Sequence, residues 1–348
     1  MTKKRLYGLD LLRIICALVI YFFHSILHMG HNYGLLSPFF KEGPIFMVLF
    51  FMISGFTLHY QYHSTTLMHM DNLKPFYIKK AADLIPLYWL LVLIYEPIYQ
   101  TLTWKRQLFL LPTELLGQQS IYDQINSYTH NSGSWFISCL IFCIFFSPFF
   151  NDLISQLSTK MKISILSVLC FLCIYGQILV KVYTTYLLYS NVVFRLFEYV
   201  IGMLVCSLYL ETKQRENNLY LLPALVSFST LILSVTTLHN GKLGNYHIYN
   251  FVVIPCSLLI LWCSLFINFK TGTILTAIIS HLNRLVYPFY IAQFFVWKII
   301  QFILDRLPFD LPNYLDIVIT LITCYLLSLT MYHTVCIPCK KIILRKFK

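Results

Sequence analysis

Ten apolar stretches, each long enough to cross a bilayer, follow one another along this chain of 348 residues. A membrane-spanning helix needs about 20 mainly apolar residues, and within lipid only helices or closed barrels satisfy every backbone polar group. The composition agrees, because 58% of the residues are hydrophobic and only 11% are charged, whereas a soluble domain carries about 25% charged residues. We therefore expect an all-α, polytopic membrane bundle of about ten helices. The stretches lie near 9–29, 44–62, 84–102, 134–154, 163–181, 194–211, 218–238, 248–268, 283–303 and 314–336.

Charge is distributed unevenly among the connecting segments. The net charge is +12, yet most Lys and Arg residues lie in segments that fall on one side of the predicted bundle, such as 63–83 and 337–348. This is the positive-inside pattern, so we expect both termini in the cytoplasm and no nucleic-acid partner. The connections are too short for a folded domain, which predicts one transmembrane domain over 1–348 without a fused soluble domain. The longest connection, about 103–133, has room for a short interfacial helix over 104–117.

The first apolar stretch carries two ionisable residues on one helical face. Arg13 and His24 are eleven positions apart, which makes about three turns and places their side chains roughly 16 Å apart along the axis. Ionisable side chains within a membrane helix are costly, so they usually face the protein interior and have a function. We expect Arg13 near the cytoplasmic surface, where Asp10 can pair with it, and His24 deeper or outward as a proton acceptor.

Other polar residues in the stretches have alternative interpretations. Arg195 and Glu198 are three positions apart, so they either neutralise one another or line a polar cavity. His24, His28 and His31 follow the i, i+4, i+7 spacing of one helical face, which zinc ligands can share, but no carboxylate accompanies them and we predict no metal site. Nucleotide-binding loops and the HExxH and GxSxG motifs are absent, which argues against ATP-driven and soluble hydrolase chemistry.

Six motifs occur along the chain in the order typical of the membrane acyltransferase-3 family, which the sequence therefore resembles. Members of this family transfer acyl groups, often acetyl, to cell-surface sugars and related acceptors. The family's marker, a basic residue followed after ten residues by His, is present as Arg13 and His24. The other motifs extend the resemblance over nearly the whole chain. They are FFMISGF (50–56), FYIKKAADLIPLYW (76–89), SWFISCLIFCIFFSP (134–148), RLFEYVIGM (195–203) and YPFYIAQ (287–293).

The chain departs from the family pattern at three positions. Asp83 stands where the family has the second basic residue of an RxxR pair that begins here at Lys80, and Lys79 is a candidate to compensate for it. Gln293 replaces a histidine, and a glutamine cannot carry a proton at neutral pH. Leu140 stands where some members carry Glu, so the chain resembles the subgroup without that residue.

The resemblance implies a reaction and its participants. The donor substrate is expected to be cytoplasmic acyl-CoA, with acetyl-CoA first and a succinyl donor as an alternative, and no tightly bound cofactor. The acceptor is a hydroxyl of an extracytoplasmic polysaccharide, such as an exopolysaccharide, or of a glycolipid. We expect Arg13 to bind donor phosphate and His24 to act as general base or as a covalent acyl carrier.

The same resemblance predicts a multi-pass protein of a bacterial plasma membrane, in contact with membrane lipid and with the polysaccharide synthesis machinery. Two other functions stay open: a membrane exporter of a surface polysaccharide, and a non-catalytic partner of a polysaccharide synthase. Further residues are expected to bind substrate within the bundle. They are Asp10, Ser54, Lys79, Lys80, Tyr88, Trp135, Arg195, Glu198, Tyr290 and Gln293.

Overall fold

The described part of the chain is helical throughout, as the sequence predicts. The computed structural model describes residues 4–100, 103–122, 132–177, 179–180, 188–212, 223–227, 229–230, 246–306, 308 and 311–347. Within these residues there are helices and connecting turns and no strand. The prediction of an all-α polytopic bundle is therefore confirmed, and the chain is a multi-pass membrane protein.

Eight helical segments among the described residues are long and apolar enough to cross a membrane. The bundle is built from α1 (Tyr7–Met29), α3 (Phe46–Tyr62), α4 (Met70–Tyr99), α7 (Trp135–Gln156), α8 (Thr159–Phe171), α10 (Val192–Glu211), α12 (Tyr246–Ser264), α13 (Ile274–Leu304) and α14 (Asn313–Met331). The apolar part of α12 is shorter, at 250–264. The predicted span near 218–238 lies mostly outside the described residues. Helices α4 and α13 begin earlier than predicted, at Met70 and Ile274.

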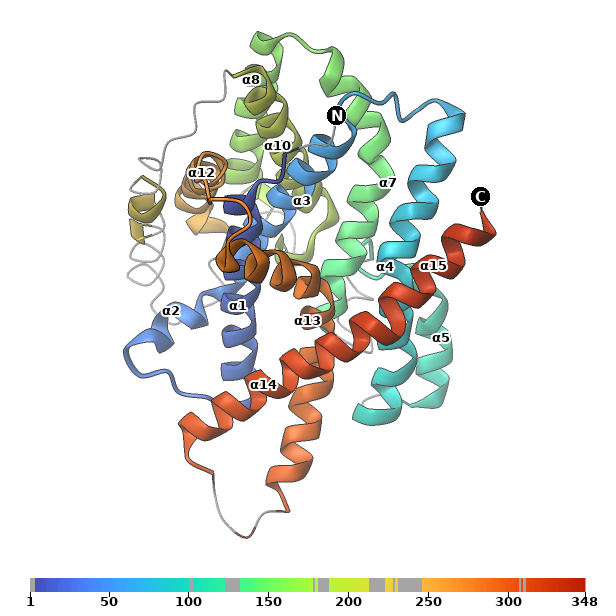
Figure 1. Ribbon diagram of the computed structural model, residues 1–348, viewed down its shortest axis with the longest axis vertical. Coiled ribbons are helices and arrows are strands. Elements are labelled where there is room, and N and C mark those ends of the chain that lie inside the picture. Colours follow the sequence, from blue (N-terminus) through green and yellow to red (C-terminus); the bar gives the residue numbers. More distant parts are fainter. Residues whose placement is uncertain are drawn as a thin grey trace.

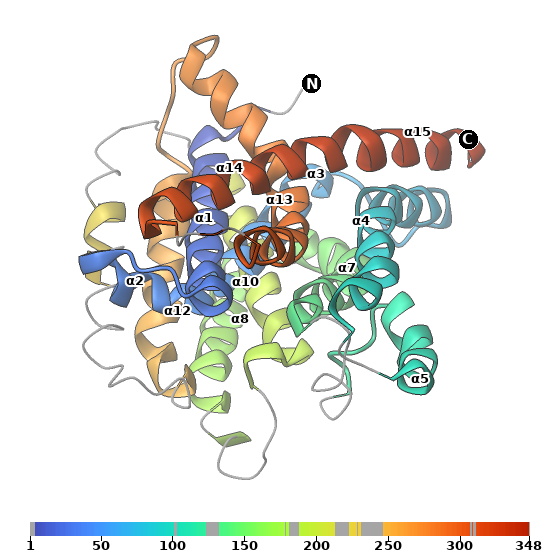
Figure 2. The same ribbon diagram turned by 90° about the horizontal axis from the view of Figure 1, so that it is seen from below.

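Helices α1 and α13 pack side by side in the bundle (Figure 1). A π-helical turn at Tyr332–Cys336 joins α14 to α15 (Ile337–Lys346), so that they form one long rod. This rod crosses α13 obliquely in Figure 1, and Figure 2 shows it along one edge of the bundle. The segment 104–117, predicted to be a short helix, forms α5 (Trp104–Leu115) at the periphery beside α4.

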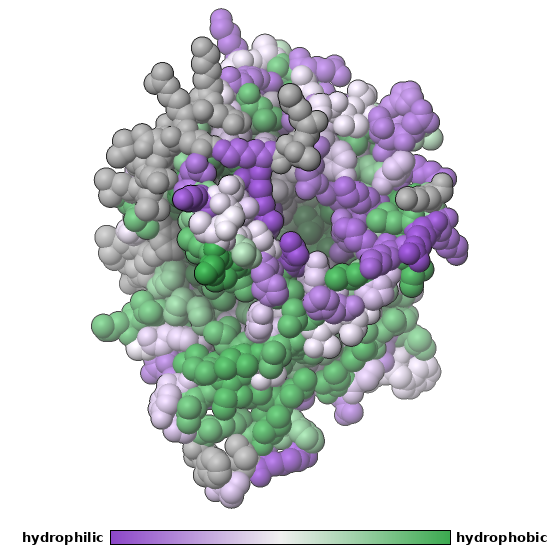
Figure 3. Space-filling model, in the orientation of Figure 1, coloured by the Kyte–Doolittle hydropathy of each residue, from purple (hydrophilic) through white to green (hydrophobic). Residues whose placement is uncertain are grey.

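The surface of the molecule has an apolar region suited to lipid and a hydrophilic region suited to water. Apolar residues cover the lower half of the face in Figure 3, over α14, and hydrophilic residues gather over α15 and the upper part. Exposed apolar side chains on α14 include Val318, Ile322 and Leu326. In water such a patch would be unfavourable, but hydrocarbon chains cover it in a bilayer. The basic residues of α15 fit the headgroup region at the side that the sequence predicts as cytoplasmic.

Two glycines allow α3 and α10 to approach each other more closely than side chains would permit. A Cβ atom at Gly55 would lie 1.9 Å from the carbonyl oxygen of Tyr199, and one at Gly202 would lie 1.9 Å from that of Met52. Small residues let membrane helices pack through their backbones in this way. Both glycines belong to the FFMISGF and RLFEYVIGM motifs, so these motifs have a packing role in this chain.

Helix α1 ends before the third histidine of its predicted stripe. Gly30 is the C-cap residue of α1. It has a left-handed φ of 70° and donates its N–H to the Ile26 carbonyl. His31 therefore lies outside the helix, and the expectation that His24, His28 and His31 share one face is wrong. Glycine takes this φ without strain, which is why the chain turns here.

Candidate active site

A cavity of about 330 Å³ runs along α1 from Arg13 to Ile20, and its lining includes Gln293, which contacts His24. At one end it is lined by Arg13, Thr57, Lys80, Asn283 and Arg284. At the other end its wall is mainly aromatic and apolar, and it closes at a glutamine. The lining there includes Ile20, Phe50, Phe136, Tyr290 and Gln293. The cavity is thus polar and cationic toward the predicted cytoplasmic side and apolar deeper in the bundle.

Arg13 holds its charge at the polar end without a carboxylate partner. Its guanidinium donates to the Thr57 hydroxyl at 2.8 Å and to the amide oxygen of Asn283 at 3.3 Å. Both acceptors are neutral, and no ion pair of Arg13 occurs within the described residues. The side chain is only partly buried, so its positive charge remains available to an anion in the cavity.

Asp10 pairs with a different arginine from the one expected. One carboxylate oxygen accepts from Arg5 Nε at 2.6 Å, and the other accepts from the Asn283 side-chain amide at 2.7 Å. Asn283 therefore bridges Asp10 and Arg13. The direct pair proposed from sequence does not form, because Arg5 satisfies the carboxylate from the chain segment before the helix.

The basic character at the cavity mouth comes from three helices. Lys80 lines the cavity, and its ammonium lies 5.7 Å from the centre of the Tyr62 ring. Asp83, the acidic departure from the family pattern, pairs with Lys340 of α15 at 2.5 Å. Lys79 does not line the cavity, and its ammonium also lies 5.7 Å from the Tyr62 ring. The cation beside Asp83 is thus supplied by the C-terminal helix.

His24 lies immediately beyond the deep end of the cavity. Its Nδ1 is 2.9 Å from Oε1 of Gln293, and Gln293 also donates from Nε2 to the Tyr290 carbonyl at 2.8 Å. His24 is partly exposed. Its Nε2 makes no hydrogen bond and is not among the fully enclosed polar atoms that lack a partner within the described residues. This nitrogen is therefore not completely enclosed, although His24 is not itself among the residues that line the cavity.

Six of the predicted substrate-binding residues do not line this cavity, namely Asp10, Lys79, Tyr88, Trp135, Arg195 and Glu198. Arg195 and Glu198 form a fully buried ion pair at 2.6 Å, as their spacing predicts. The Arg195 guanidinium also lies 5.6 Å from the centre of the Trp135 ring. Tyr88 donates from its hydroxyl to the Glu114 carbonyl, which attaches α4 to α5. In the structure these contacts stabilise helix packing.

The cavity also uses residues that the sequence reasoning did not select. Thr57, Asn283 and Arg284 line it, and the first two hold Arg13. On α13, Asn283, Tyr290 and Gln293 recur at helical spacing and share one face. This polar stripe along an otherwise apolar helix could have been recognised in the sequence, and it marks the face of α13 that lines the cavity.

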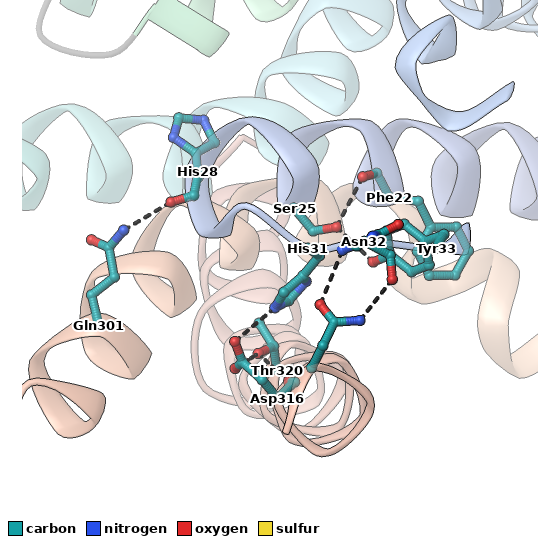
Figure 4. Close-up of polar contacts among 10 residues, drawn as sticks. Phe22, Ser25, His28, His31, Asn32, Tyr33, Gln301, Asp316 and Thr320 are labelled. Atoms are coloured by element: carbon teal, nitrogen blue, oxygen red, sulfur yellow. Dashed lines mark hydrogen bonds and ion pairs between the residues drawn. The ribbon is translucent and has the colours of Figure 1, made fainter. Parts of the chain in front are cut away.

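A second polar cluster lies past the end of α1 (Figure 4). The buried His31 ring places Nε2 2.9 Å from Oδ2 of Asp316, and Thr320 donates to the other oxygen of that carboxylate at 3.0 Å. His28 points elsewhere: its ring stacks on Trp297, and its carbonyl accepts from Gln301. No three His, Cys, Asp or Glu side chains are placed to hold a metal ion in the parts of the chain that the structure covers.

The fold and the cavity define a polytopic membrane protein that encloses a site, cationic at one end and apolar at the other. The chain matches the family model described as an acyltransferase domain, of acyltransferase family 3, over residues 6–333. It therefore belongs to the acyltransferase-3 family and is a membrane acyltransferase. Searches of curated proteins and of solved structures give no significant match.

Proposed function

We propose that this enzyme takes an acyl group from cytoplasmic acyl-CoA and transfers it to a hydroxyl of an extracytoplasmic polysaccharide or glycolipid. The observation that carries the proposal is a cavity that joins a cationic end to the glutamine holding His24. Such a cavity suits a donor with an anionic head and a long neutral arm that ends in the reactive group. The plasma membrane of a bacterium is the proposed location.

The cationic end suits the phosphates of coenzyme A. Arg13, Lys80 and Arg284 contribute three positive charges to the lining, and Asp83 contributes one negative charge that Lys340 neutralises. Guanidinium groups donate hydrogen bonds to phosphate oxygens in a fixed fork, and these charge-assisted bonds are stronger than neutral ones. In the proposal, Arg13 exchanges its neutral acceptors Thr57 and Asn283 for a phosphate oxygen.

The deep end suits the acyl group and the arm that carries it. Ile20, Phe50 and Phe136 give this part of the wall an apolar surface. The Tyr290 hydroxyl donates its hydrogen bond to the Gly133 carbonyl at 2.6 Å. A lining with few open polar groups favours a short neutral acyl chain over an anionic one. Acetyl is therefore the proposed acyl group, ahead of succinyl.

His24 is the proposed reactive residue. Its Nε2 nitrogen acts either as a general base toward the acceptor hydroxyl or as the nucleophile that carries the acyl group. Ser54 lines the cavity between Arg13 and His24 and is proposed to contact the arm of the donor. No tightly bound cofactor is required, because acyl-CoA enters as a substrate.

The test is a count of ester groups on surface glycans from matched strains. Cells with the wild type, His24→Ala, His28→Ala or no copy are compared by mass spectrometry and by alkaline release of esters, with the protein level in membranes measured by blot. His28 is a matched control on the same helix, since its ring stacks on Trp297 instead of meeting Gln293.

The proposal expects esters in the wild type and in His28→Ala, and none in His24→Ala or in cells without the gene. Surface glycan itself should persist in all four strains. If the glycan disappears from the surface while the remaining chains keep their esters, the protein is an exporter or a partner of the synthase, and the proposed reaction is wrong.

A further inference from the structure

Gln293 occupies the boundary between the cavity and His24. It lines the cavity with only 1% of its surface exposed, and it contacts the imidazole directly. Its amide contacts two groups: the Tyr290 carbonyl at 2.8 Å, which can only accept, and the His24 Nδ1 atom at 2.9 Å, whose role depends on the tautomer. Gln293 therefore stands between the cavity and the Nδ1 side of the imidazole.

The neighbours of Gln293 fix the orientation of its amide. The Tyr290 carbonyl can only accept a hydrogen bond, so the NH₂ group of Gln293 must face it. The amide oxygen then faces His24, and this oxygen can also only accept. The proton of a neutral imidazole must therefore lie on Nδ1. Without it, the lone pair of Nδ1 would face a lone pair of the Gln293 amide oxygen.

We propose that Gln293 is a positioning residue that holds neutral His24 in the Nδ1–H tautomer and leaves Nε2 as its reactive nitrogen. The inference rests on the proposed function and deepens it. Nε2 is the nitrogen that is not completely enclosed, and it makes no hydrogen bond within the described residues. Gln293 thereby does for His24 what an orienting carboxylate does in other sites, but without its charge.

The assignment specifies the reaction at the atomic level. Nε2 accepts the proton of the acceptor hydroxyl as its oxygen bonds to the acyl carbon, the C–S bond breaks, and the coenzyme A thiolate takes the proton back from Nε2. If His24 instead carries the acyl group, Nε2 forms the bond to the acyl carbon as the C–S bond breaks and coenzyme A leaves as the thiolate. The acceptor oxygen then replaces Nε2 on the acyl carbon, and the hydroxyl proton passes to the thiolate. Both routes fail in the other tautomer, because Nε2 then bears a proton.

Three substitutions separate positioning from packing. Gln293→Leu keeps most of the volume and removes the acceptor, Gln293→Glu keeps the acceptor and adds a charge, and Gln301→Leu is the matched control. Gln301 lies on the same helix and donates to the carbonyl of His28. Purified full-length protein is assayed in liposomes that contain glycolipid extracted from the source cells, with acetyl-CoA as donor and free thiol as product.

We expect Gln293→Leu to lower kcat by about 10²- to 10⁴-fold, the range spanned by losing general-base catalysis and by a wrong histidine tautomer, with the KM for acetyl-CoA within about two-fold of the wild type. Gln293→Glu should keep kcat within about ten-fold and move the acid limb of the pH–rate profile to higher pH, because a carboxylate stabilises the protonated imidazole. Gln301→Leu should match the wild type.

The inference is overturned if Gln293→Leu keeps its kcat, or if Gln293→Glu has the pH profile of the wild type. The proposed function fails by a different result, namely no acetyl-CoA-dependent transfer by the wild type or full transfer by His24→Ala. Transfer that is lost in His24→Ala and kept in Gln293→Leu would reject the positioning role alone.

Discussion

Replacement of Gly202 by alanine should destabilise the bundle at the crossing of α3 and α10. The added Cβ would lie 1.9 Å from the Met52 carbonyl oxygen, whereas a close carbon–oxygen contact is about 3.3 Å, so the helices would have to separate by roughly 1.4 Å. Overpacking of this kind costs about 1–3 kcal/mol. The upper half of that range applies, because the opposing atom is backbone and cannot rotate away.

Thermal unfolding with a thiol-reactive fluorogenic dye measures this effect, since buried free cysteines, Cys206 on α10 among them, become reactive when the bundle unfolds. Gly176→Ala is the matched control, because its Cβ would meet its nearest neighbour, a Phe194 ring carbon, at 3.6 Å, an ordinary contact. We expect Gly202→Ala to lower Tm by several degrees and Gly176→Ala to leave it unchanged. Equal Tm values for the two variants would refute the close-crossing explanation.

A double-mutant cycle sharpens the same prediction. Gly55 faces the Tyr199 carbonyl across the same crossing, so the first alanine forces a separation that the second alanine also needs. The loss of stability in Gly55→Ala/Gly202→Ala should be clearly smaller than the sum of the single losses. Additive losses would mean that the two glycines act at independent contacts.

Three further predictions concern charged groups. Arg13→Gln should raise the KM for acetyl-CoA by roughly 10- to 150-fold, the value of a hydrogen bond to a charged group, measured by thiol release; an unchanged KM places the phosphates elsewhere. Asp316→Ala should lower Tm more than Asp316→Asn, because only the alanine leaves the buried His31 without its acceptor; equal Tm values would contradict this. Burial raises the pKa of Glu42 from 4.5 to about 7, so the protonated carboxyl contributes stability that is complete below about pH 4.5 and is lost as pH rises through 7. Glu42→Gln should therefore show a smaller fall in Tm between pH 5 and pH 8 than the wild type, and an identical fall would contradict the assignment.

The helices of the bundle were predictable because their cause is local. An apolar stretch of about 20 residues has no stable alternative to a helix in lipid, and spans such as α1 and α10 follow directly from it. The ion pair of Arg195 and Glu198 was equally predictable from the sequence, since the two residues are three positions apart on one helix. The family marker of Arg13 and His24 directed attention to the helix that borders the cavity.

The contacts that complete the site were not predictable, because they join residues distant in sequence. Arg13 meets Asn283 across 270 positions and Thr57 across 44 positions. No pattern within one helix specifies which polar residue of another helix faces it. For the same reason, the single sequence favours the nearby Arg13 as the partner of Asp10 over Arg5, which lies outside the apolar stretch.

The account depends most on the assignment of the reactive group to His24. Purified full-length wild type, His24→Ala and His28→Ala are placed in liposomes with source-cell glycolipid and acetyl-CoA labelled in its acetyl group. The label recovered in alkali-labile esters is then counted. The account predicts label in esters with the wild type and His28→Ala and none with His24→Ala. Equal labelling by His24→Ala and the wild type would contradict it.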